Sequence, residues 1–214
     1  YDELEEFDAT DLDNWDLATA SPMYRIRGRT LGILGFGHIG RTLALKTQGL
    51  GMRVIAHDPY IDEGALTDHQ VEMVSIDDLF SMADFLTVHT PLVPQTRGLI
   101  DESRLRSMKS TATIINCARG AIIDHQALER ALRKGWIAAA AGDVFEPEHL
   151  DPDHPLLALP NLIATPHVAF YSEESVLDLE IMAAENVAAI LSGSRPAAVV
   201  NPEVLDLPRW SHLQ

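Results

Sequence analysis

From Arg29 onward, short apolar runs alternate with amphipathic stretches. The apolar runs predict buried strands at 30–34, 53–57, 85–88, 113–117, 138–143 and 162–164. The stretches between them have helical periodicity and predict helices at 39–50, 76–82, 102–108, 125–134 and 172–191. Because strands and helices alternate, the predicted fold class is α/β, a doubly wound parallel sheet with helices on both faces.

The two ends of the chain differ from this pattern. Residues 1–22 are acidic, carry Trp15 and end in Ser21-Pro22, which predicts a solvated helix or arm followed by a connector. The last predicted helix has Ser172 as a capping residue and precedes Gly193. Three prolines exclude a continued helix over residues 194–214, so we expect an extended tail there.

Composition narrows the class of protein further. The 214 residues include 32 acidic and 16 basic side chains, a formal charge of −16, which argues against binding to nucleic acid phosphates. No apolar run is long enough to span a bilayer, so no membrane association is expected. The single cysteine excludes an intrachain disulfide and favours the cytoplasm. Because the chain opens without a methionine, we expect it to be a fragment.

A glycine-rich turn follows the first predicted strand. The sequence LGILGFGHIG contains G-x-G-x-x-G between a strand and a helix, the context in which this motif binds a dinucleotide. Gly35 allows the tight turn, Gly37 lets the backbone approach a pyrophosphate, and Gly40 lets the helix pack on the strand. The backbone amides near His38 and Ile39 are then expected to point at the anion from a helix N-terminus.

An aspartate occupies the position at which dinucleotide-binding folds carry an acid. Asp58 lies 18 residues after Gly40, at the end of the second predicted strand, where an acid accepts hydrogen bonds from the adenosine ribose. A carboxylate there repels a 2′-phosphate, so NAD is expected rather than NADP. The alternative is a glycine turn of the same fold that binds nothing.

Three later strand ends carry groups suited to carbonyl reduction. Arg119 follows the strand 113–117, Glu146 and Glu148 follow the strand 138–143, and His167 follows the strand 162–164. Ligands of open α/β sheets bind at the carboxyl ends of the strands. Histidine exchanges protons near neutral pH, a nearby carboxylate favours its protonated form, and arginine binds a carboxylate with its planar fork. Each residue, taken alone, is also compatible with an ordinary surface loop.

Other reactive patterns are absent from the sequence. No H-E-x-x-H or C-x-x-C motif occurs, so we expect no structural or catalytic metal. Cys117 lies two residues before Arg119 without a nucleophile elbow around it, and we interpret it as a packing residue near the cofactor.

Six motifs occur together in the chain: LGILGFGHIG, the aspartate of HDPY, HTPLVPQTRGLI, IINCARGAIID, AAGDVFEPE and NLIATPHVAFYSEES. Over about residues 24–193 they resemble the cofactor-binding domain of the D-isomer-specific 2-hydroxyacid dehydrogenases. The last motif is especially similar to the branch that contains phosphoglycerate dehydrogenases and the carboxyl-terminal binding protein corepressors. In those corepressors a tryptophan stands three residues after the histidine, where this chain has Phe170.

The resemblance implies a role for each candidate residue. Arg119 would bind the substrate carboxylate and carbonyl, His167 would donate and accept the proton, and Glu148 would be its acidic partner, with Glu146 as a competing acid. Asp143 would lie against the nicotinamide. The residues expected to contact NAD are Gly35, Gly37, His38, Ile39, Gly40, Asp58, Thr90, Thr96, Cys117, Ala118, Arg119, Asp143, His167 and Phe170.

The resemblance also implies a domain organisation. Residues 23–193 would form the NAD-binding Rossmann-type domain, residues 1–22 an interdomain arm through which family members form homodimers, and residues 194–214 a tail that returns to a second, substrate domain. Most of that second domain is not among these 214 residues, so we expect the chain to bind NAD but to catalyse poorly.

The predicted function is that of an NAD-dependent oxidoreductase interconverting a D-2-hydroxy acid and a 2-keto acid. One alternative is an NAD-responsive dimeric binding protein, similar to the corepressors, with little or no catalysis. A second is a Rossmann reductase of another class, which the Arg, Glu and His at separate strand ends argue against. The particular hydroxy acid is not specified by these residues.

Overall fold

A computed structural model of the chain describes residues 24–61 and 71–210. The predicted arm at 1–22 lies outside these described residues. The described residues form two compact units, one that ends at residue 164 and one that begins at residue 165, and we describe them separately. The predicted domain boundary follows residue 193, whereas the compact units divide at residue 164, so the last long helix is grouped with the tail.

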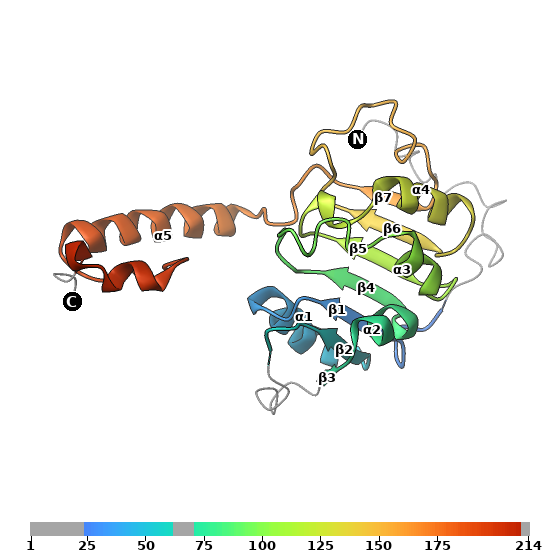
Figure 1. The fold of residues 1–214 in the computed structure, drawn as a ribbon, viewed down its shortest axis with the longest axis horizontal. Coiled ribbons are helices and arrows are strands. Elements are labelled where there is room, and N and C mark those ends of the chain that lie inside the picture. The colour runs from blue at the N-terminus through green and yellow to red at the C-terminus, as the bar shows by residue number, and fades with distance from the viewer. Residues whose placement is uncertain (1–23, 62–70, 211–214) are drawn as a thin grey trace, which may run out of the picture. The chain divides into compact units, whose positions relative to one another are not determined.

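The first unit contains a seven-stranded sheet in which every described pairing is parallel. The strand order is β3-β2-β1-β4-β5-β6-β7 (Figure 1). The order reverses between β1 and β4, and this switch point is where doubly wound folds bind ligands. The strands are β1 (Thr30–Leu34), β2 (Arg53–His57), β3 (Val71–Met73), β4 (Phe85–Val88), β5 (Thr113–Asn116), β6 (Ala139–Gly142) and β7 (Leu162–Ala164).

Helices cover both faces of the sheet. In Figure 1, α2 (Ile76–Met82), α3 (Glu102–Ser107) and α4 (His125–Arg133) follow one another across one face. Their apolar side chains form the larger core with the sheet. The helix α1 (His38–Gln48) contributes Ala44 to a second core, which contains Leu31 and Ile33 of β1. Leu34 of the same strand belongs to the larger core, so adjacent residues of β1 face different cores. This confirms the buried strands and the doubly wound fold predicted from the sequence.

The predicted elements agree closely with the observed ones, with one omission. The observed bounds of β1, β2, β4, β7 and α2 equal the predicted ranges, and the other predicted elements differ by one or two residues at an end. The strand β3 was not predicted. Its three residues are Val71, Glu72 and Met73, with Glu72 exposed, so they form no apolar run.

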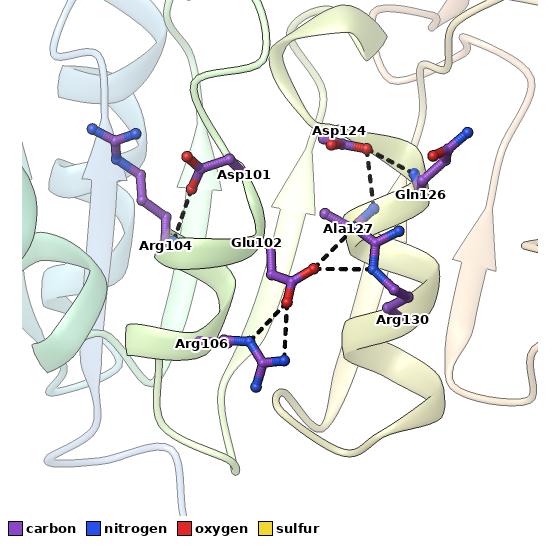
Figure 2. Close-up of polar contacts among 8 residues, drawn as sticks. All are labelled: Asp101, Glu102, Arg104, Arg106, Asp124, Gln126, Ala127 and Arg130. Carbon is purple, nitrogen blue, oxygen red and sulfur yellow. Dashed lines mark hydrogen bonds and ion pairs between the residues drawn. The ribbon is translucent and has the colours of Figure 1, made fainter.

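Polar contacts fix the helices beside the later strands (Figure 2). The side chain of Asp101 caps α3 at the backbone N–H of Arg104, and Asp124 caps α4 at the N–H groups of Gln126 and Ala127. The Glu102 carboxylate accepts hydrogen bonds from Arg106 and Arg130 and thereby joins the two helices. The hydrogen bond from Arg106, together with Arg130, lowers the pKa of Glu102 despite some desolvation.

A buried carboxylate, that of Asp84, lies at the amino ends of the neighbouring strands β1 and β4. Asp84 accepts hydrogen bonds from the backbone N–H of Thr30 at 2.8 Å and from Lys109 Nζ at 2.9 Å, and Arg29 Nη1 lies 3.5 Å away. Burial alone raises the pKa of Asp84, but the hydrogen bonds from Thr30 and Lys109 and the charges of Lys109 and Arg29 outweigh it and lower the pKa. The ionised carboxylate thus stabilises the folded state.

We expect Asp84→Ala to lower the free energy of unfolding by about 2–4 kcal/mol, because the Thr30 N–H and the Lys109 ammonium lose their acceptor in a buried place. Urea denaturation at pH 7 measures the loss. The control is Glu72→Ala, since Glu72 pairs with Arg53 on the exposed surface and should cost less than about 1 kcal/mol. Equal losses in the two variants would contradict this role of Asp84.

The second unit begins with a short segment and continues into α5 (Glu173–Leu191). As predicted, Ser172 caps this helix: its side chain accepts from the N–H of Ser175, and the Ser175 hydroxyl accepts from the N–H of Ser172. The tail is not simply extended, because it contains short 3-10 helices at Pro202–Asp206 and Pro208–Trp210. None of the helices described is both long and apolar enough to cross a membrane.

Candidate active site

The glycine-rich turn links β1 to α1. Gly35 has a φ of 92°, and a Cβ added there would lie 2.7 Å from the backbone nitrogen of Thr90. A Cβ on Gly40 would lie 2.5 Å from the carbonyl oxygen of Gly35. In contrast, a Cβ on Gly37 would meet nothing within 4 Å. The first and third glycines therefore allow close packing within the protein, whereas Gly37 leaves its backbone open to a ligand.

The start of α1 is also exposed. His38 and Ile39 follow Gly37 on the surface, and Ile39 is 67% exposed although it is apolar. The first N–H groups of a helix have no partner within the helix, and its dipole favours an anion there. The turn thus combines an open backbone with an exposed helix start, and phosphate binding there stays a prediction.

Asp58 follows β2 and contacts the glycine-rich turn directly. Its Oδ2 accepts a hydrogen bond from the backbone N–H of Phe36 at 2.8 Å, and its Oδ1 accepts one from the N–H of Tyr60 at 3.0 Å. The sequence predicted a role for Asp58 in binding the ribose. The structure adds a second role, because the same carboxylate ties the end of β2 to the turn.

The loop after β4 borders the other side of the turn. Thr90 is half-buried and its backbone touches Gly35. Thr96 Oγ1 donates to the carbonyl of Pro91 at 2.7 Å and accepts from the N–H of Val93 at 2.8 Å, so this hydroxyl closes its own loop. His89, which the sequence did not single out, lies at the switch point with Nε2 2.9 Å from the hydroxyl of Thr87, and burial lowers its pKa.

The loop after β5 is organised by a residue that sequence reasoning missed. Asn116 is buried, its Oδ1 accepts from the N–H of Ala118 at 3.0 Å, and its Nδ2 donates to the carbonyl of Arg119 at 3.0 Å. The available signal was an asparagine within the run Ile114-Ile115-Asn116-Cys117. The Arg119 side chain is exposed, and its guanidinium donates to the carbonyl of Ala118 at 2.6 Å.

Asp143 and Cys117 lie near one another at the carboxyl ends of β6 and β5. The backbone N–H of Asp143 donates to the carbonyl of Asn116 at 3.0 Å, and the Asp143 side chain is buried. Burial and the charge of Asp143 raise the pKa of the Cys117 thiol. A raised pKa keeps Cys117 a thiol and makes it a poor nucleophile. The residue is exposed, so it does not fill the packing position expected from the sequence.

The two candidate acids in the loop after β6 differ in their surroundings. Glu146 Oε1 lies 3.9 Å from Nη1 of Arg97, in an exposed ion pair that joins this loop to the loop after β4. Glu148 lies two residues further on and is exposed. The first unit therefore brings the Gly35 turn, Asp58, Thr90, Cys117, Ala118, Arg119, Asp143 and Glu148 to loops that follow the carboxyl ends of its strands.

His167 and Phe170 belong to the second unit. His167 has a φ of 56°, which is rare for a residue other than glycine, and its backbone N–H donates to the carbonyl of Thr165 at 3.1 Å. Its ring meets that of Phe170 edge to face, with centroids 6.1 Å apart. Strained backbone of this kind is concentrated at functional sites. Within the described residues, no group of three side chains is placed to hold a metal ion.

Comparisons with known proteins identify the family. Residues 5–169 match the family of D-isomer specific 2-hydroxyacid dehydrogenases, in its NAD binding domain. A glyoxylate reductase from Aeropyrum pernix is 47% identical over 180 residues, which cover 84% of this chain and 54% of that protein. A D-3-phosphoglycerate dehydrogenase from Methanocaldococcus jannaschii is 43% identical over 175 residues, which cover 81% of this chain and 33% of that protein.

A solved structure agrees with these relatives. The D-isomer specific 2-hydroxyacid dehydrogenase from Lactobacillus delbrueckii ssp. bulgaricus, in its NAD-complexed form, matches with a TM-score of 0.79 and 32% identity, over 89% of this chain and 62% of that one. The chain thus spans about half the length of its glyoxylate reductase relatives and a third of the phosphoglycerate dehydrogenase. It belongs to the D-isomer specific 2-hydroxyacid dehydrogenase family and contains the NAD-binding domain of that family.

Proposed function

We propose that the protein interconverts a D-2-hydroxy acid and a 2-keto acid with NAD as the hydride carrier. The observation that carries this proposal is the exposed guanidinium of Arg119, presented by a loop fixed on buried Asn116 at the carboxyl end of β5. In a chain of charge −16, an anionic acid needs a local cation, and Arg119 offers a planar fork that matches a carboxylate.

In this proposal, Arg119 binds the substrate carboxylate and turns the carbonyl carbon toward the cofactor. Bound NADH supplies the hydride that C2 of the keto acid accepts. The imidazolium of His167 donates a proton to the carbonyl oxygen. The products are the hydroxy acid and a neutral His167. Glu148 favours the protonated ring. We propose Glu148 rather than Glu146 for this role, because the spacing of the family's motif favours Glu148.

We propose that NAD lies across the switch point. The backbone at Gly35, Gly37, His38, Ile39 and Gly40 would bind the pyrophosphate, supported by the open space at Gly37. Asp58 would accept hydrogen bonds from the adenosine ribose. The groove would be completed by Thr90, Thr96, Cys117, Ala118, Arg119, Asp143, His167 and Phe170. The hydroxyl of Thr96 is hydrogen-bonded within its own loop, so Thr96 would contribute to the groove through the shape of that loop.

Asp58→Asn is expected to weaken NAD binding about tenfold and to reduce the preference for NAD over NADP. The asparagine keeps an oxygen that accepts from the N–H of Phe36, but it lacks the charge that repels a 2′-phosphate. Fluorescence titration with NADH and NADPH measures both affinities. Asp77→Asn is the control, since Asp77 is an exposed carboxylate in the first turn of α2. An unchanged NADPH to NADH ratio in Asp58→Asn would contradict the ribose role.

We also propose that the protein is a cytoplasmic homodimer in which residues 1–22 form the dimerisation arm. The support comes from the sequence, namely an acidic arm ahead of the domain and a single cysteine. Sedimentation equilibrium of the chain with and without residues 1–22 tests the arm, because its removal should yield monomers.

The catalytic proposal is tested on the full-length protein by following NADH absorbance with a panel of acids. The panel contains glyoxylate, hydroxypyruvate and bulkier 2-keto acids, and phosphoglycerate with NAD in the reverse direction. Turnover of one of these supports the proposal. NAD-dependent dimerisation without turnover of any of them would favour an NAD-responsive binding protein instead.

A further inference from the structure

A histidine at the start of α4 contacts the loop after β6 and takes no part in the proposed reaction. His125 is the first residue of α4, and its backbone position is fixed because the preceding Asp124 caps the helix at Gln126 and Ala127. Its ring packs edge to face on Phe145, with centroids 5.7 Å apart and an interplanar angle of 61°. Phe145 immediately precedes the Glu146–Glu148 segment, so His125 supports the loop that carries the candidate acid.

Phe145 also connects this loop to the loop of Arg119. A Cβ added to Gly120 would overlap the backbone carbonyl carbon of Phe145, so the two backbones are in direct contact. A Cβ on Gly142 would lie 2.7 Å from Cζ of the Phe145 ring. Phe145 therefore contacts Gly120 through its backbone, and Gly142 and His125 through its ring, so it connects His125 to the residue next to Arg119.

The surroundings of His125 favour the neutral ring. Its Nδ1 is buried and has no hydrogen-bond partner among the described residues. The ring lines a cavity of about 10 Å³ with Ile114, Asn116, Ile123 and Phe145, which is about the space of a single water. A protonated Nδ1 would place an N–H there without a protein acceptor, which is costly in a buried position.

The charged groups around the ring act in both directions. Burial is the largest effect and lowers the pKa of His125, and the charge of His154, in the loop before β7, lowers it further. The backbone of Glu146, as a hydrogen-bond acceptor, and the carboxylates of Asp124 and Glu146 raise it. The net result is a pKa below the ordinary value for histidine, so the ring is neutral at pH 7.

We propose that His125 is a positioning residue whose neutral ring holds Phe145, and through Phe145 both the Arg119 loop and the Glu146–Glu148 loop, and that protonation of His125 releases this contact. The inference rests on the proposed function for its catalytic consequence. His125 limits the rate at acidic pH, because its protonation displaces the two loops there.

The first test uses NMR on the 214-residue chain, with ¹³C-labelled histidine and ¹⁵N-labelled backbone. We expect the His125 ring to titrate below the ordinary histidine pKa, and the amide signals of Arg119, Gly120 and Phe145 to shift in step with it. A titration at the ordinary histidine value, or amide signals that do not follow the ring, would overturn the proposal. This readout does not depend on catalysis.

The second test measures the pH profile of keto acid reduction by the full-length protein. His125→Phe keeps a ring against Phe145 and cannot be protonated, so we expect about normal activity at pH 7.5 and a several-fold larger retained fraction at pH 5.5. His125→Ala should lower kcat/KM about tenfold at pH 7.5 with NADH affinity unchanged. Gln126→His, an exposed histidine one position along, is the control and should leave the profile unchanged.

The two hypotheses fail in different ways. If the wild-type protein reduces no keto acid, the proposed function is contradicted, and the NMR titration still decides the coupling of His125 to the two loops. If the wild-type protein is active but His125→Phe keeps the acid limb of the wild type, the positioning role is contradicted and the proposed function stands.

Discussion

His167→Ala is expected to reduce kcat for keto acid reduction by about 10²–10⁴-fold in the full-length protein, while the affinity for NADH stays within about twofold. The methyl group of alanine cannot donate a proton to the carbonyl oxygen, and general acid catalysis contributes rate factors of that size. Stopped-flow absorbance at saturating NADH measures the rate, and fluorescence titration measures NADH binding.

Two further variants sharpen that test. His149→Ala removes an exposed histidine from the loop after β6 and should leave kcat unchanged. His167→Gln keeps a side chain of similar size and hydrogen-bonding capacity without a titratable proton, so its kcat should be as low as that of His167→Ala. A His167→Ala protein with wild-type turnover would contradict the assignment of His167 as proton donor.

Arg119→Ala should lower kcat/KM for the keto acid by about 10³-fold, mainly through a higher KM. The substrate carboxylate then loses a charge-assisted, two-point partner, and truncation of one member of such a pair costs about 2–5 kcal/mol. Arg119→Lys keeps the charge but not the planar fork, so we expect it to fall between wild type and alanine. Steady-state kinetics with varied keto acid give both constants.

The matched control is Arg25→Ala. Arg25 is exposed and precedes the amino end of β1, at the edge of the sheet opposite the glycine-rich turn. Its loss lowers the net charge equally but should not change KM. If Arg25→Ala raised KM as much as Arg119→Ala, a general electrostatic effect would explain both results, and the specific role of Arg119 would be refuted.

The sequence was sufficient to predict six of the seven strands, because strands covered on both faces are mostly apolar and stand out from the helices between them. Leu31 and Ile33 face one core while Leu34 faces the other, so every position of β1 is buried. The strand β3 was missed since exposed Glu72 interrupts its three residues. Edge strands of this length depend on pairing with a neighbour, here β2, which local sequence does not reveal.

The candidate site was predictable where a local motif fixes the backbone. It was less predictable where residues far apart in the sequence come into contact. The glycine spacing identified the turn, and Asp58 followed from its place after the second strand. The second role of Asp58, the hydrogen bond to Phe36, needs the three-dimensional approach of two loops. The same is true of His125, whose contact with Phe145 joins α4 to the loop after β6.

The buried amide of Asn116 has a consequence for the thermodynamics of substrate binding. Because this side chain already bonds the backbone of Ala118 and Arg119, that loop is ordered before any ligand arrives. Fixing a free backbone costs about 1–2 kcal/mol of entropy per residue, and the substrate is spared this cost. Calorimetry on Asn116→Ala should therefore show a more unfavourable binding entropy with the Arg119 contacts themselves retained.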